Sequence, residues 1–118
     1  MLTDFVQISE YSKLENWQTL VKSIDTPTDF EVHTHTLFKS ASRRLYLVWI
    51  NEYIEEEAHD HTEEKFFILE GTCTCLLDNQ EVKLQPGSFI DVPVDTYHNL
   101  KVTSPTPIKM IISKRKVA

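Results

Sequence analysis

The chain has 118 residues, a formal net charge of −6 and a hydrophobic content of 41%. This length predicts a single domain over residues 1–118 with a real hydrophobic core, and the composition is that of an ordinary globular protein. The acidic balance argues against nucleic acid as a partner, and the longest apolar runs are far too short to span a membrane.

The N-terminal part carries an early acidic residue, Asp4, and has neither a basic cluster nor a continuous apolar region. We therefore expect no secretory signal and a cytoplasmic location. Ser12 and Glu15 have the spacing of a capping box, and apolar residues then recur at helical intervals as far as Val21. These signals predict one short helix over residues 13–23.

From about residue 29 to residue 114 the pattern changes to short strands. Apolar and β-branched runs predict eight or so of them: FEVHTHTLF, RRLYLVWIN, KFFILEG, TCTCLL, EVKL, SFIDVP, HNLKVT and IKMIIS. The later runs are separated by the turn signals DNQ, QPG, PVDT and SPTP. The order predicts an all-β fold, a mostly antiparallel sandwich or barrel that follows one helix.

Two pairs of potential metal ligands are interpreted as structural. Cys73 and Cys75 lie on one face of a predicted strand with Cα atoms about 6.6 Å apart, near the far limit for a disulfide. We expect both to be reduced and buried, which is commoner for such a pair than binding a soft metal.

His33 and His35 have no carboxylate beside them in the sequence. A solvated strand face or a dimer edge is the interpretation of this second pair.

Strand periodicity divides the run EKFFIL into two faces. Glu64, Phe66 and Ile68 share one face, and Phe67 and Leu69 belong to the other. If the first face lines an interior, the second needs cover from another sheet or from a partner subunit. This need predicts a homodimer.

Three of the five histidines are placed to hold a metal ion. His59 and His61, at i and i+2 near a strand edge, project the same way, and Glu64 follows within reach as an oxygen ligand. His98 begins a strand whose apolar face it shares, so it points toward the core as a fourth ligand. Imidazole and carboxylate suit iron, manganese, nickel, copper or zinc. The sequence therefore predicts one divalent transition metal with coordination positions left open.

These residues carry a resemblance to the cupin superfamily, whose first motif runs G-x5-H-x-H-x(3,4)-E-x6-G and whose second runs G-x5-P-x-G-x2-H-x3-N. The segment from His59 to Gly71 is similar to the first motif, and Gly87, Pro93 and His98 follow the spacing of the second. The resemblance implies a cupin double-stranded β-helix, which is a jelly-roll-like barrel, with a metal in its mouth.

Several positions depart from the cupin pattern. Tyr53 stands where the first motif opens with glycine, Asp95 at the inner glycine of the second motif and Val102 at its terminal asparagine. Only two residues separate the second motif histidine, His61, from Glu64, instead of the three or four of the pattern. Glu63 is therefore a rival for the carboxylate ligand.

The run from Glu52 to Glu64 contains seven acidic residues and no lysine or arginine. As a solvated loop it has no functional meaning. As the rim of the site it favours neutral or cationic substrates, unless Arg43 and Arg44 turn toward the site.

As an enzyme, the expected protein is a non-haem metal dioxygenase or a metal-dependent isomerase acting on a small molecule. Tyr97, beside His98, is a candidate proton donor, although a buried aromatic on a strand is the commoner role. The alternative is a non-enzymatic cupin that binds or senses a small molecule or a sugar through the same barrel mouth.

Overall fold

The structure, a computed structural model, describes residues 22, 24–56 and 61–117. Nine strands lie within these ranges: β1 Val32–Lys39, β2 Arg43–Ile50, β3 Tyr53–Glu56, β4 Thr62–Glu70, β5 Cys73–Leu77, β6 Gln80–Leu84, β7 Phe89–Val92, β8 His98–Val102 and β9 Ile108–Lys116. The helix expected over residues 13–23 lies outside the described residues, apart from Lys22. In the part of the chain that is described, no helix has the length and apolarity needed to cross a membrane.

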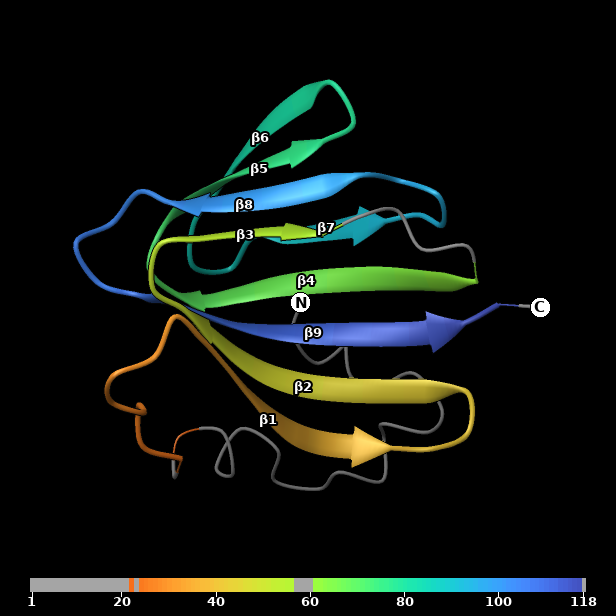
Figure 1. The fold of residues 1–118 in the computed structure, drawn as a ribbon, viewed down its shortest axis with the longest axis horizontal. Helices are drawn as coiled ribbons and strands as arrows, with labels where there is room; N and C mark the ends of the chain where they lie inside the picture. Colours follow the sequence, from red (N-terminus) through yellow and green to blue (C-terminus); the bar gives the residue numbers. More distant parts are fainter. Residues whose placement is uncertain (1–21, 23, 57–60, 118) are drawn as a thin grey trace.

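The strands form two antiparallel sheets (Figure 1). The larger sheet has the order β1-β2-β9-β4-β7 and the smaller one the order β3-β8-β5-β6. All eight strands predicted from the sequence are present, and β3 is an additional one. Its sequence, YIEE, belongs to the acidic run and was open to interpretation as a loop; pairing with β8 makes it a strand.

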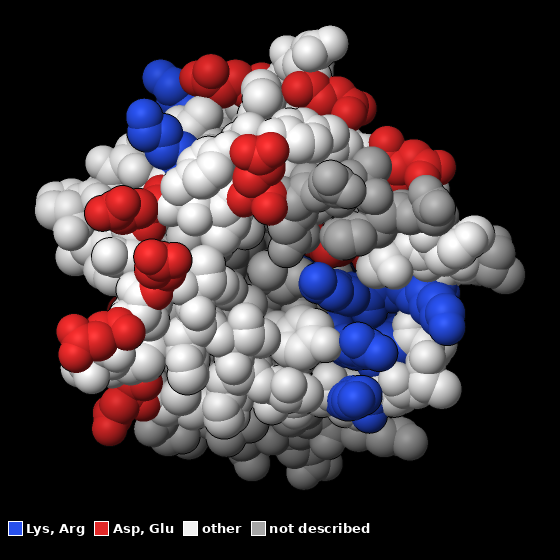
Figure 2. Space-filling model, in the orientation of Figure 1, with Lys and Arg blue, Asp and Glu red and all other residues white. Residues whose placement is uncertain are grey.

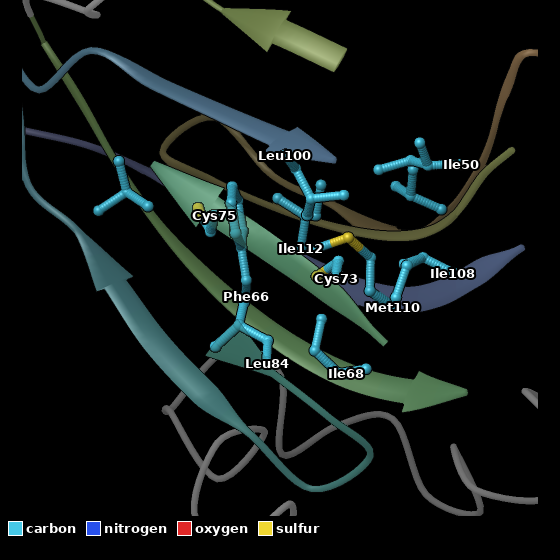
Figure 3. Packing of buried hydrophobic residues seen from close by; sticks show 12 residues of the cluster. Ile50, Phe66, Ile68, Cys73, Cys75, Leu84, Leu100, Ile108, Met110 and Ile112 are labelled. Carbon is cyan, nitrogen blue, oxygen red and sulfur yellow. The ribbon is translucent and has the colours of Figure 1, made fainter. Parts of the chain in front are cut away.

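Side chains that point inward from both sheets form one apolar core (Figure 3). Phe66, Ile68 and Leu100 are at most 1% exposed, which confirms the inward direction predicted for them. Cys73 and Cys75 are buried in the same core as free thiols, again as predicted. Burial raises the pKa of Cys73 to about 12 and that of Cys75 to about 11, so both thiols stay protonated at neutral pH.

A second apolar cluster lies on the outer face of the larger sheet. Phe67 is 6% exposed there and packs with Leu45, Leu47, Trp49 and Ile111. Partly buried residues of the same chain, among them Ile24 and Phe30 from the segment before β1, lie against this cluster. The chain therefore supplies its own cover for at least part of the face that contains Phe67 and Leu69.

Candidate metal centre

Two of the predicted ligands, Glu64 and His98, meet inside the barrel at one end of the apolar core. Glu64 comes from β4 of the larger sheet and His98 from β8 of the smaller one, and both are at most 2% exposed. The Oε2 atom of Glu64 lies 3.6 Å from Nε2 of His98. Two ligand atoms at about 2.1 Å from one tetrahedral ion are roughly 3.4 Å apart, so the pair fits a shared ion.

The ring of His98 is held in a defined orientation. Its Nδ1 atom lies 3.2 Å from the carbonyl oxygen of Thr96, and since a carbonyl only accepts, Nδ1 is the donor. In the neutral ring, the lone pair of Nε2 then faces the carboxylate of Glu64. Two acceptor atoms that face each other favour a cation between them, as in histidine ligation of metals. Phe66 packs edge-on against the imidazole with ring centroids 5.7 Å apart.

Lys114 is a second close neighbour of Glu64, and it is not among the site residues predicted from the sequence. Its Nζ atom lies 3.4 Å from Oε1 of Glu64 and 6.0 Å from the centre of the Tyr46 ring. Glu64 and Lys114 are direct cross-strand partners, so their side chains share the inner face. A period-two count from the apolar Ile112 would have placed Lys114 inward, but Lys114 begins a run of three basic residues, which is more often a solvated chain end.

Of the two histidines of the first motif, the structure describes only His61. His59 lies outside the described residues. His61 is exposed just before β4, and its carbonyl oxygen accepts a hydrogen bond of 2.7 Å from the backbone nitrogen of Val117. His61 precedes Thr62, the first residue of β4, so strand alternation does not fix the direction of its side chain relative to Glu64. Among the residues that the structure describes, no three His, Cys, Asp or Glu side chains gather as a metal site.

Glu63, the rival carboxylate, lies on the other face of β4. Its Oε1 atom accepts a hydrogen bond from Nε of Arg115, and this bond raises the pKa of the Arg115 guanidinium. Of the two neighbouring glutamates, Glu64 is therefore the one that faces His98.

Tyr97 lies apart from the buried pair. It is half-buried, and its backbone nitrogen donates to Oδ1 of Asp78 at 3.2 Å. Desolvation, followed by the nearby side chains of Glu55 and Tyr97, raises the pKa of the Tyr53 hydroxyl. The backbone of Tyr97 is thus held at the turn after β5, whereas His98 is buried in the barrel.

The comparisons with known proteins agree with this architecture. The profile of the cupin domain matches residues 44–113, and the chain therefore belongs to the cupin family. A stretch of 51 residues is 39% identical to quercetin 2,3-dioxygenase of Bacillus subtilis (strain 168). That stretch covers 43% of this chain but only 15% of the dioxygenase.

Solved structures confirm the predicted cupin fold. The cupin domain of Cnp3 from Schizosaccharomyces pombe has a TM-score of 0.71 at 16% identity, over 81% of this chain and 71% of that chain. The cupin domain of an XRE-family transcriptional regulator from Enterobacter cloacae has a TM-score of 0.69 at 14% identity, over 75% of this chain and all of that one (100%). At such low identities the likeness concerns the fold alone.

Proposed function

We propose that the protein holds one divalent transition metal in the barrel mouth through His59, His61, Glu64 and His98. The observation that supports this proposal is the meeting of two buried donors from opposite sheets, Glu64 Oε2 and His98 Nε2, at 3.6 Å. Iron, manganese, nickel, copper or zinc bound there would supply Lewis-acid or dioxygen chemistry at open coordination positions.

The reaction that we propose is the metal-dependent oxidation of a small molecule by dioxygen. Its support is the partial identity to quercetin 2,3-dioxygenase, which involves 43% of this chain. The alternative enzymatic function is that of a metal-dependent isomerase. Within the chain, Glu64 and His98 would hold and orient the centre, and Phe66 and Val92 would keep water from its buried side. Tyr97 as a proton donor remains a prediction.

A non-enzymatic cupin that senses or binds a small molecule or sugar is the second candidate. One observation favours it. Apolar side chains fill the barrel interior (Figure 3), and Glu64 and His98 are themselves buried, so little room is left for a ligand except at the mouth. A ligand held at the mouth can be recognised without being converted.

We further propose a cytoplasmic homodimer that pairs through β1. This strand is at the edge of the larger sheet, and Val32, at its start, is 45% exposed. His33 and His35 are exposed on the same strand. An open edge can pair with another chain, and a charge on the edge opposes such pairing. Light scattering at micromolar concentration should give a dimer for the wild type and a shift toward monomer for Val32→Lys. A monomeric wild type would contradict this assembly.

Metal analysis of protein purified without a histidine tag tests the central proposal. We expect about one equivalent of a transition metal, and a lower melting temperature after chelation, because an ion that binds only the folded state stabilises it. Less than about a tenth of an equivalent, together with an unchanged melting curve, would refute the metal site. Oxygen uptake by the iron-loaded protein with small phenols, thiols or diketones then separates the candidates: uptake favours the dioxygenase, and bound metal without turnover favours the sensor.

A further inference from the structure

A group of basic side chains lies at the same mouth of the barrel. Arg44, Lys114 and Lys116 line a hollow of about 160 Å³ together with Ala41, Ser42 and Thr62. Figure 2 shows basic side chains gathered on this face of the molecule, on the side where β9 ends. We call this hollow the basic pocket.

Strand register explains why the basic pocket opens on the inner face. Arg44 on β2 is the cross-strand partner of Lys114 on β9, and Lys114 is the partner of Glu64 on β4. Direct partners in an antiparallel pair share a face, so Arg44 lies on the inner side with Glu64. Tyr46, two residues further along β2, packs against the inner core and supports the same direction.

Arg43 provides the contrast, because adjacent residues of a strand point to opposite faces. Its neighbour Leu45, two positions on, belongs to the outer apolar cluster. Arg43 lines a separate hollow with Glu63 and Arg115, among others, which contains acidic as well as basic groups. The two neighbouring arginines therefore serve different sides of the sheet.

The chemistry of the basic pocket suits a small carboxylate. Among the described residues, its lining includes three cations and two hydroxyl groups and no acidic side chain. The guanidinium of Arg44 can bind a planar carboxylate through two parallel hydrogen bonds, and lysines add charge without such a directional demand. The hollow of about 160 Å³ is well above the size that holds a single water molecule, so it has room for one small acidic group.

Glu64 limits how much negative charge the pocket accepts. Its Oε1 atom lies 3.4 Å from Lys114, so part of the positive charge is already balanced beside the pocket. Three cations and one carboxylate still leave an excess of positive charge, so the pocket attracts an anion. The preference for a carboxylate comes from the planar guanidinium of Arg44.

We propose that the basic pocket binds the carboxylate group of a small-molecule ligand at the barrel mouth. Binding of the anion does not require a metal; only the further statement that this ligand is the substrate rests on the proposed function. From the acidic run we expected neutral or cationic substrates unless Arg43 and Arg44 turn toward the site. Arg44 does lie on the inner side of the sheet, and an anionic ligand is therefore favoured instead.

Titration with benzoate, benzamide and inorganic phosphate tests the inference in the full chain, followed by calorimetry or by NMR shifts of residues 42, 44 and 62. Benzoate should bind. Benzamide has the same shape without the charge and should bind at least about tenfold more weakly. Phosphate should also bind more weakly than benzoate. Arg44→Gln should weaken benzoate binding about tenfold, as expected for the loss of a charged hydrogen bond. Arg43→Gln, its matched control, should change it by less than about twofold.

Two results would contradict the proposed carboxylate pocket. Equal losses in Arg43→Gln and Arg44→Gln would mean general attraction by surface charge and would overturn the pocket. Phosphate binding as tight as benzoate, with the same dependence on Arg44, would overturn the carboxylate class. Lys116→Gln, at an exposed position, serves as a second test with the same expected direction should Arg44→Gln fold poorly.

The titration is run on chelator-treated and on as-purified protein, whose metal content is measured separately. Benzoate binding that depends on Arg44 in a protein without metal would support the pocket while the metal proposal fails. A protein that holds metal but binds no benzoate would leave the metal proposal intact and refute the pocket.

Discussion

The two ends of the barrel interior are built from the same strands and differ in chemistry. At one end Ile68 of β4 faces Met110 of β9, and at the other end Glu64 faces Lys114 on the same two strands. All four side chains point inward because even spacing keeps them on one face. The alternation of side chains along a strand therefore decides whether a residue points into the barrel. Its position along the strand decides whether it lies in the apolar core or at the mouth.

This comparison predicts that truncation at the apolar end has the largest effect on stability. Ile68 is completely buried, so Ile68→Ala removes buried methyl groups and leaves a cavity, which should lower the free energy of unfolding by about 2–5 kcal/mol. Urea unfolding followed by circular dichroism measures it. Lys83→Ala, at an exposed position of β6, is the control and should change stability by less than about 0.5 kcal/mol. Similar losses at both positions would show that the interior is not a packed core.

The two glycines sharpen the same contrast. A Cβ atom at Gly71, next to the apolar end, would lie 2.8 Å from the carbonyl oxygen of Pro107 in a backbone with φ of +83°. Gly71→Ala should therefore cost at least about 2 kcal/mol, from steric overlap as well as backbone strain. At Gly87, where φ is +92° and nothing lies within 4 Å, only the strain of about 1 kcal/mol applies. Equal effects in thermal unfolding of the two variants would contradict the close approach at Gly71.

At the polar end, the prediction concerns metal affinity rather than stability. Glu64→Gln keeps the shape of the side chain but removes its charge, and should weaken metal binding about tenfold to a hundredfold. Glu63→Gln, on the outer face beside Arg115, should change little. Competition titration against a fluorescent chelator measures both constants. A result in which Glu63→Gln loses the metal and Glu64→Gln keeps it would reverse the assignment of the two faces.

Lys114→Met should give the smallest effect of this series. A cation 3.4 Å from one oxygen of Glu64 opposes a metal ion bound at the other oxygen, so its removal should strengthen metal binding by at least about threefold. Stability should change by about 1 kcal/mol or less, because the Lys114 side chain is still 30% exposed and its ion pair is partly screened. Weaker metal binding in the same chelator competition would mean that Lys114 supports the centre instead.

Much of the fold follows from local patterns in the sequence. Alternation placed Glu64, Phe66 and Ile68 on one face, and the structure confirms all three as buried. The strand at residues 53–56 was not predicted, because YIEE has too few apolar residues to show a period, and only its pairing with β8 makes it a strand. Composition alone could not decide whether an acidic segment is paired.

In the sequence by itself, the two motifs indicated the cupin family. Strand alternation and turn chemistry determined most of the strands and the inward direction of Glu64 and His98, because both depend on near neighbours. Only the tertiary structure decided which inward residues meet. Glu64 and Lys114 are 50 positions apart in the chain (114 − 64) and become partners through the register of β4 and β9. That register is set by the packing of whole sheets, and so the basic pocket beside the carboxylate could not be found from local patterns.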